Sequence, residues 1–384
     1  MKYLFFISGI LIFYTFIGYP ISLKILKSMK KKKNIEVNND YYPNITIIIS
    51  AHNEEKNIVK KLNNIMELDY FFDKIEVIIA SDNSVDKTEM LVEKFIKNNN
   101  LKNFKLYSVK KRKGKTNAQN EATKVALGEI LFFSDANSMW EKNALKKIIR
   151  NFYDNSISYV CGKLIYVNSL ENITSYTENN YWNYDLNMRE IESDYGSITA
   201  GNGAIYAIRK KDYVEIDPLE CHDGTFPTIV ALKQKRAIYE KEAIAYEKAG
   251  ETSEDEYSRK VRMGRDILQA KYSNFSKYNP FKVGLYSYFY FCHRYLRYSL
   301  YMLHIILFVS NLFLIKENLF YLVIFVGQVI FYLLALLGFI TKTRYKALYY
   351  CYYYTMTIFA QLVSIKRSLL GQNKPFWEKA ESTR

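Results

Sequence analysis

The stretch "NITIIISAHNEEKNIVKKLNNI" (residues 44–65) passes from one apolar pattern to another within a few residues. Its first part, "ITIIIS", is a short run rich in β-branched residues, which is typical of a strand buried on both faces of a parallel sheet. A polar turn follows, and then Ile58, Leu62 and Ile65 recur at helical spacing. The stretch therefore predicts a buried strand, a polar turn and an amphipathic helix.

The same order recurs further along the chain. Residues 74–98 ("KIEVIIASDNSVDKTEMLVEKFIKN") predict another buried strand and helix. "FKLYSV" (104–109) predicts a third strand, followed by a basic loop and the helix "NAQNEATKVA" (117–126), and "EILFFSDANSMW" (129–140) predicts a fourth strand. This alternation predicts βαβ units and an α/β fold with a mostly parallel, doubly wound sheet.

Polar residues follow the carboxyl ends of these predicted strands, where open α/β sheets bind ligands. Any one of these groups could simply cap the next helix. Their occurrence after successive strands favours a ligand site at one edge of the sheet. The groups are Ala51-His52-Asn53-Glu54, Ser81-Asp82-Asn83-Ser84, Lys113-Gly114-Lys115 and Asp135-Ala136-Asn137.

The basic loop "KRKGKTNAQN" (111–120) contains Gly114-Lys115-Thr116, which matches the end of a phosphate-binding P-loop. Val109 occupies the position of the first P-loop glycine, and a β-branched residue suits that turn badly. The chain also lacks a G-x-G-x-x-G turn after the first strand, which argues against a dinucleotide site. With these two kinds of site disfavoured, the sheet edge still offers carboxylates for a hard cation and Lys115 for phosphate. A nucleotide diphosphate bridged by a divalent ion would require both.

Residues 3–23 carry no charge and are long enough to cross a bilayer as a helix. A cleaved signal peptide is the alternative, but the run lacks a small-residue cleavage site. The basic segment "KILKSMKKKK" (24–33) follows, and the positive-inside rule places it in the cytoplasm. We therefore expect an N-terminal transmembrane helix at 1–25 and a basic cytoplasmic linker at 26–43.

The C-terminal third is apolar again, so we expect a multi-pass protein of the plasma membrane with a cytoplasmic catalytic domain. The tyrosine-rich segment 347–365 could span the membrane or lie in its interface. Aromatic residues interleaved with His293, Arg294 and Arg297 predict a surface-lying helix before the first C-terminal span. The expected divisions are a catalytic domain at 44–280, an interfacial amphipathic segment at 281–297, transmembrane helices at 298–315 and 319–340, and a cytoplasmic tail at 366–384.

The chain of 384 residues has a formal net charge of +15, which raises the possibility of a nucleic-acid partner. Much of this excess lies beside the predicted spans, as topology alone requires. The aspartates at the sheet edge would also repel a phosphate backbone. We therefore expect no nucleic acid among the partners, with a membrane-anchored nucleic-acid-binding protein as the alternative from another class.

The order of these motifs resembles that of the inverting family 2 glycosyltransferases of GT-A fold. The membrane-bound branch, which makes cellulose, hyaluronan and poly-N-acetylglucosamine, is the most similar. The resemblance implies a Rossmann-like GT-A catalytic domain with N- and C-terminal transmembrane helices. It rests on "SAHNEEKNI", "ASDNSVDKT", "KGKTNAQNEA", "FSDANS", "GSITAGNGAIYAIRK" and "CHDGTFPTIVALKQKRAIYEKEAIAYE".

The resemblance also implies the residues that bind a nucleotide-sugar donor, most simply a UDP-sugar. Asp135 would hold Mg²⁺ or Mn²⁺, with Asn137 in place of the family's second aspartate. Asp82 could instead cap a helix, and Glu54 could do the same. The implied donor-binding residues are Ala51, Asn53, Glu54, Asp82, Lys115, Asp135 and Arg262.

On the acceptor side, the resemblance implies that Asp223 is the catalytic base and that Gly201, Asn202 and Gly203 lie near the acceptor. His222 stands where the family usually has a first acid. Within "RKVRM", Arg262 matches the family's arginine, and Met263 replaces its tryptophan.

The activity implied is transfer of a sugar to a polysaccharide or lipid-linked acceptor. Since Met263 replaces a ring that helps to bind an acceptor sugar, a transferase that adds a single sugar to a glycolipid is the alternative. A degenerate, non-catalytic partner subunit is a further alternative, because Ser81, His222, Asn137 and Met263 depart from the strongest motif forms.

Overall fold

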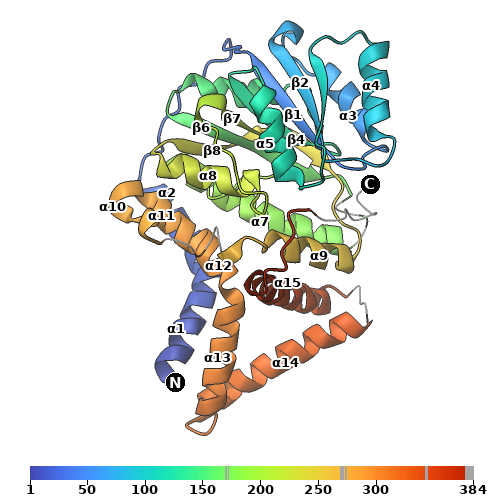
Figure 1. Cartoon of the computed structure of the whole chain (residues 1–384). Helices are drawn as coiled ribbons and strands as arrows, with labels where there is room; N and C mark the ends of the chain where they lie inside the picture. Colours follow the sequence, from blue (N-terminus) through green and yellow to red (C-terminus); the bar gives the residue numbers. More distant parts are fainter. Residues whose placement is uncertain (169–170, 172, 269–271, 273–274, 342–344, 377–384) are drawn as a thin grey trace.

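The computed structural model describes residues 1–384 apart from 169–170, 172, 269–271, 273–274, 342–344 and 377–384. It contains an α/β body with one sheet, from which a group of long helices extends (Figure 1). The strands are β1 (Ile45–Ala51), β2 (Ile75–Ser81), β3 (Phe104–Ser108), β4 (Ile130–Asp135), β5 (Met139–Trp140), β6 (Ile157–Tyr166), β7 (Tyr206–Arg209) and β8 (Arg236–Glu247).

The sheet has the order β3-β2-β1-β4-β7-β6-β8-β5. The first four strands in this order, β3, β2, β1 and β4, pair in parallel with one another, as the βαβ alternation predicted. Beyond β4, strand β7 pairs antiparallel with both β4 and β6, and β6 then pairs parallel with β8. Ala51 is level with Ser81, and Ser50 with Asp135, so the carboxyl ends of β1, β2 and β4 meet at one edge.

Helices cover both faces of the sheet. Strand β1 is buried along its whole length, since Ile47 and Ile49 face one core while Ile48 faces the other. The first core also takes residues from α3, α4 and α6, and the second takes them from α5 and α8. These helices are α3 (Ile58–Met66), α4 (Thr88–Asn98), α5 (Lys115–Val125), α6 (Ala144–Ile149) and α8 (His222–Leu232), and the remaining helices of the body are α7 (Ile173–Tyr195) and α9 (Ser253–Met263).

The extending helices come from both ends of the chain, and α1 packs beside α13 (Figure 1). They are α1 (Lys2–Phe13), α2 (Tyr19–Met29), α10 (Pro280–Val283), α11 (Leu285–Tyr290), α12 (Leu296–Tyr298), α13 (Leu300–Leu314), α14 (Leu319–Thr341) and α15 (Lys346–Leu369). The short turns between elements are the π-helical η1 (Tyr14–Gly18) and η7 (Phe291–Tyr295) and the 3₁₀-helical η2 (Phe72–Lys74), η3 (Arg150–Tyr153), η4 (Lys210–Asp212) and η6 (Phe275–Tyr278).

Among the described residues, Lys2–Met29 and Leu319–Thr341 are long and apolar enough to cross a membrane. Leu285–Tyr298 and Leu300–Leu314 qualify only as a pair, and the two are bent by 63°. Apolar side chains on α14 point outward, with Leu319 at 72% and Ile340 at 67% exposure. Such a surface suits lipid rather than water.

A buried ionic network joins the body to α15. On α9, Arg259 forms ion pairs with Glu178 of α7 and with Glu256, and Lys260 pairs with the same two carboxylates. The hydroxyl of Tyr353 on α15 donates to Glu178. Because buried charges need partners, these residues hold α7, α9 and α15 to one another.

Candidate active site

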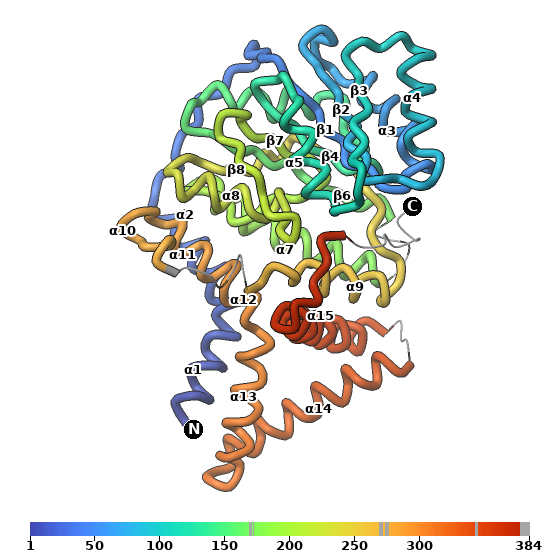
Figure 2. The backbone as a smooth tube through the Cα atoms, in the orientation of Figure 1, coloured from blue at the N-terminus to red at the C-terminus, as the bar shows by residue number. Residues whose placement is uncertain are grey.

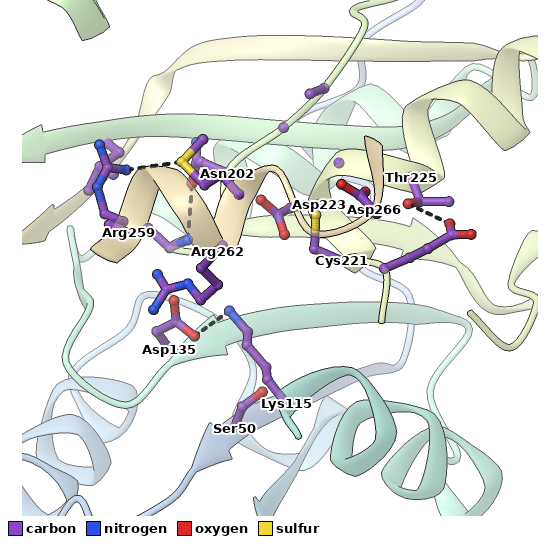
Figure 3. A pocket seen from close by; sticks show the side chains of 18 of the residues that line it. Ser50, Lys115, Asp135, Asn202, Cys221, Asp223, Thr225, Arg259, Arg262 and Asp266 are labelled. Carbon is purple, nitrogen blue, oxygen red and sulfur yellow. Dashed lines mark hydrogen bonds and ion pairs between the residues drawn. The ribbon is translucent and has the colours of Figure 1, made fainter. Parts of the chain in front are cut away.

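A cavity of about 750 Å³ opens at the carboxyl ends of β1, β2 and β4. It is the edge at which the sequence predicted a ligand site. Figure 3 shows Lys115 and Asp135 facing each other in this cavity, with Asp223 and Arg262 nearby. The predicted site residues that line it are Ala51, Glu54, Asp82, Lys115, Asp135, Asn137, Gly201, Asn202, Gly203, Asp223 and Arg262.

Asp82 holds the basic loop in place. One carboxylate oxygen accepts from the backbone N–H of Lys113 at 3.0 Å, and the other accepts from Gly114 at 2.8 Å. The side chain is 4% exposed. At the start of α4 it is Asp86, and not Asp82, whose carboxylate accepts from the backbone N–H of Thr88. Asp82 therefore positions the loop that leads into α5 and is not a helix cap.

Lys115 begins α5 and forms an ion pair with Asp135 at the end of β4. Burial opposes its charge, but the carboxylates of Asp135 and Asp223 outweigh this effect and raise the pKa of Lys115. Its ammonium is therefore protonated at neutral pH. Gly203 makes room for the pair, because a Cβ there would lie 2.7 Å from Lys115 Nζ and 3.0 Å from Asp135 Oδ2.

The glycine-rich segment also lines the cavity. The side-chain amide of Asn202 donates to the carbonyl of Gly162 at 2.8 Å, and its oxygen accepts from the backbone N–H groups of Ala204 and Ile205. Its polar atoms are thus used in shaping the turn. Gly201 donates its N–H to the carbonyl of Asp223 at 2.7 Å, which ties this segment to the start of α8.

Asp223 lies in the first turn of α8 and faces the cavity, where its charge acts on Lys115. The neighbouring His222 points the other way, into the core, where its Nε2 lies 2.9 Å from Asn120 Oδ1. Burial, reinforced by the charge of Lys115, lowers the pKa of His222 well below its usual value. A neutral, buried His222 packs against the rings of Phe133 and Phe226 and does not line the cavity, whereas Asp223 does, with Asp266 beside it (Figure 3).

Arg262 reaches the cavity from α9 (Figure 3). Burial and the neighbouring charges of Arg259 and Arg265 lower the pKa of Arg262 to about 10, so it remains charged at neutral pH. Met263 also lines the cavity and is 41% exposed.

The turn after β1 is divided between two roles. Glu54 lines the cavity, and its carbonyl accepts from the backbone N–H of Ile58 at the start of α3. Asn53 is outside the residues that line the cavity. It adopts a φ of 54°, and its side-chain oxygen accepts from the backbone N–H of Val85 at 2.9 Å. The structure thus brings Ala51 and Glu54 to the cavity, while Asn53 joins this turn to the one after β2.

Further cavity residues were absent from the sequence-based predictions. Glu247 ends β8 and accepts from the hydroxyl of Ser138, beside the Asp135 turn. Phe376 follows α15, where the chain turns back toward the body (Figure 2), and the guanidinium of Arg112 lies 4.8 Å from the centre of its ring. Glu247 is the last residue of the predicted segment 221–247, although no role was predicted for it, whereas Phe376 lies far from every predicted motif.

A divalent ion fits this site only if the donor supplies most of its ligands. No group of three or more His, Cys, Asp or Glu side chains suited to a metal occurs in the described part of the chain. Asp135 and Asn137 do line one cavity, and the missing Cβ of Gly203 leaves Asp135 Oδ2 unobstructed. The donor set, one carboxylate and one amide oxygen, suits a hard cation that is shared with phosphate oxygens.

The sheet order and the polar cavity define a mixed α/β protein of GT-A fold. Comparison with known proteins supports this assignment. The chain superposes on the mannosyltransferase PcManGT from Pyrobaculum calidifontis, solved with GDP-Man and Mn²⁺, with a TM-score of 0.72 at 19% identity. The match covers 96% of this chain and 99% of that one, and it confirms the predicted fold class.

The chain matches the family described as "Glycosyl transferase family 2" over residues 46–216. It is 31% identical over 147 residues to poly-beta-1,6-N-acetyl-D-glucosamine synthase of Staphylococcus aureus (strain COL), covering 38% of this chain and 34% of that protein.

A second relative is the dolichyl N-acetyl-alpha-D-glucosaminyl phosphate 3-beta-D-2,3-diacetamido-2,3-dideoxy-beta-D-glucuronosyltransferase of Methanococcus voltae. It is 36% identical over 108 residues, which cover 28% of this chain and 33% of that protein. The chain thus matches about a third of the length of these curated relatives. The family resemblance predicted from the motifs is confirmed.

Proposed function

We propose that this protein is a membrane-bound inverting glycosyltransferase that moves a sugar from a nucleotide-sugar donor, a UDP-sugar, to a polysaccharide or lipid-linked acceptor. The observation that carries the proposal is the single cavity that combines the Lys115–Asp135 pair, Arg262 and the carboxylate of Asp223. Charged groups of both signs, at the edge of a family 2 domain, suit the departure of a diphosphate and the activation of a hydroxyl.

In this proposal Asp223 is the general base. An acceptor hydroxyl gives its proton to the Asp223 carboxylate, and its oxygen forms a bond to the anomeric carbon of the donor sugar. The bond from that carbon to the nucleotide diphosphate breaks, and the diphosphate leaves with the electron pair. Attack from the opposite face inverts the anomeric centre, through an oxocarbenium-like transition state.

Lys115 and Arg262 stabilise the leaving diphosphate, since both are cations aimed into the cavity at neutral pH. Asp135 and Asn137 would hold Mg²⁺ or Mn²⁺ together with the donor phosphates. When bound, the ion would supply positive charge at the leaving group. Asp82 contributes by fixing the loop that precedes Lys115.

The membrane placement is part of the proposal. Lys2–Met29 and α14 cross the bilayer, with the bent pair α11–α13 entering it, and the GT-A domain lies on the cytoplasmic side in the plasma membrane. The basic residues after α2 favour this orientation. Addition of a single sugar to a glycolipid is the second candidate, and it is favoured by Met263 lining the cavity where the related synthases carry a tryptophan.

The test is donor breakdown and sugar transfer by the purified, detergent-solubilised chain. A panel of UDP-, GDP- and TDP-sugars is offered with and without Mn²⁺ and with membrane lipids supplied. We expect metal-dependent UDP release from one sugar, reduced about 10²- to 10⁴-fold in Asp223→Asn. The matched control Glu215→Gln, an exposed acid before α8, should keep full activity. No release from any donor would overturn the proposal in favour of a non-catalytic subunit.

A further inference from the structure

We propose that the acceptor is a saccharide carried on a lipid phosphate, and that Lys277 and Arg294 bind that phosphate. The inference rests on the proposed function and narrows its acceptor to one class. Lys277 belongs to η6 and Arg294 to η7, in the segment that leads from the body into α13. Both line the same cavity as Lys115 and Asp223. The cavity therefore extends from the donor end to the base of the apolar helices.

These two cations differ in their surroundings from Lys115 and Arg259, which line the same cavity. Lys115 is paired with Asp135, and Arg259 with Glu178 and Glu256. Within the part of the chain that the structure describes, no carboxylate lies at ion-pair distance from Lys277 or Arg294. Arg294 donates through Nε to the carbonyl of Thr199 at 3.3 Å, and its two terminal nitrogens have no hydrogen-bond acceptor among the described residues. A pair of cations of this kind is suited to an anion from outside the protein.

A second cavity adjoins the first at this point. It has a volume of about 500 Å³, and both cavities are lined by Tyr278 and Tyr290, whose stacked rings have centroids 4.0 Å apart. Aromatic and aliphatic side chains make up most of its wall, so it suits hydrocarbon. The full lining is Tyr278, Pro280, Gly284, Leu285, Ser287, Tyr288, Tyr290 and Phe291.

The second cavity lies beside surfaces that suit a membrane. On α10 the ring of Phe281 is 98% exposed, and on η7 Phe291 is 41% exposed. The segment Leu285–Tyr298 meets Leu300–Leu314 at a bend of 63°, as expected where a helix in the interface turns into the bilayer. An apolar cavity, two cations and a carboxylate thus follow one another from the membrane side to the donor side. This order matches the tail, phosphate and sugar of one amphiphile.

The experiment measures binding of farnesyl phosphate to the purified full-length chain by microscale thermophoresis, in a neutral detergent. We expect Lys277→Gln combined with Arg294→Gln to raise the Kd at least tenfold, and Arg294→Lys to retain part of the affinity. Lys282→Gln, on α10 outside both cavity linings, is the matched control and should bind as the wild type does. Farnesol, which lacks the phosphate, should bind at least tenfold more weakly.

Several results would overturn the inference. They are equal binding of farnesol, full competition by inorganic phosphate at matched concentration, equal competition by phosphatidylglycerol, or a parallel loss of UDP affinity in the double variant. Equal binding of farnesol would indicate a simple apolar groove, and full competition by inorganic phosphate would indicate a free-phosphate site. Equal competition by phosphatidylglycerol would indicate a general anionic-lipid surface, and a parallel loss of UDP affinity would indicate a donor-binding role. An unchanged melting temperature of the double variant shows that any loss is not unfolding. Donor breakdown is assayed separately. A protein that still breaks down the donor but does not bind the lipid phosphate would contradict this inference and leave the proposed function standing.

Discussion

The ammonium of Lys115 and the carboxylate of Asp135 form an ion pair where the N-terminus of α5 faces the end of β4. The pair keeps a cation ready for phosphate, although no single motif contains both residues. We expect Lys115→Met to lower kcat/KM by about 10²- to 10³-fold, as loss of one preorganised electrostatic group commonly does. Initial rates of sugar transfer check this. Lys124→Met, at the other end of α5, should stay within twofold of the wild type.

Asp82 should act on donor binding through the loop it holds. In Asp82→Asn, an amide N–H₂ must face one of the two backbone N–H groups that the carboxylate now accepts. Leaving such a donor unpaired costs about 1–3 kcal/mol. We expect the Kd for UDP, measured by calorimetry, to rise at least fivefold. Asp86→Asn, which weakens the hydrogen bond from the backbone N–H of Thr88 at the start of α4, should lower the melting temperature without this change in Kd. Equal UDP affinity in both variants would argue against the role of Asp82.

Gly203→Ala tests whether space beside the Lys115–Asp135 pair is needed. The added methyl would lie 2.7 Å from Lys115 Nζ and 3.0 Å from Asp135 Oδ2, so the pair must shift. Because the end of a lysine side chain moves easily, we expect little loss of stability but at least a tenfold loss of kcat/KM. Gly327→Ala on α14, where a Cβ would meet no atom within 4 Å, is the control. Full activity of Gly203→Ala would show that the pair tolerates displacement.

Gly114→Ala should disturb the contact between the basic loop and the chain after α15. Gly114 has a φ of 94°, and a Cβ there would lie 2.2 Å from the carbonyl oxygen of Pro375. Gly284→Ala isolates the backbone effect, since its φ is 57° but no atom lies within 4 Å of the new Cβ. We expect both to lose stability by about 1 kcal/mol, and only Gly114→Ala to lose donor affinity. Thermal unfolding and UDP binding separate the two effects.

Lys61 gives the stability of the body a dependence on pH. It is fully buried in α3 and donates to the carbonyl of Ser138 at 2.6 Å. Burial lowers its pKa to about 7, so between about pH 7 and 10 the unfolded chain binds more protons than the folded one. Stability therefore rises with pH in this window, by at most about 1.4 kcal/mol per pH unit.

The measurement is the melting temperature of the wild type and of Lys61→Met from pH 6 to 10. We expect the melting temperature of the wild type to rise relative to that of Lys61→Met as the pH rises through this window. Lys60 is an exposed neighbour on the same helix, so the melting temperature of Lys60→Met should depend on pH as that of the wild type does. A pH-independent difference between wild type and Lys61→Met would show that Lys61 keeps its ordinary pKa.

Much of the fold could be predicted because strands such as β1 and β2 are buried throughout. Their runs of β-branched residues indicate this burial in the sequence. The edge that carries Asp82, Lys115 and Asp135 followed from the parallel order alone. Strand β7, which pairs antiparallel between β4 and β6, lacks such a signal, since its four residues are placed by pairing with distant partners.

The partners of the site residues could not be predicted. Asp82 is bound by backbone N–H groups 31 and 32 residues further along the chain, and a sequence pattern does not record such a contact. No role was predicted for Arg259, whose guanidinium pairs with Glu178, 81 residues earlier. Local periodicity describes a helix face, but the identity of the neighbour depends on how the elements pack.

The network of Glu178, Arg259, Lys260 and Tyr353 has a practical consequence for anyone who wishes to produce a water-soluble catalytic fragment. Cutting the chain before α15 would remove the hydroxyl that donates to Glu178 and would open two buried carboxylates and two cations to solvent. Helix α9, which carries Arg262, would then lose one of its supports. The membrane-side helix is thus part of the scaffold of the catalytic domain, and a fragment without it would be a poor substitute for the whole chain.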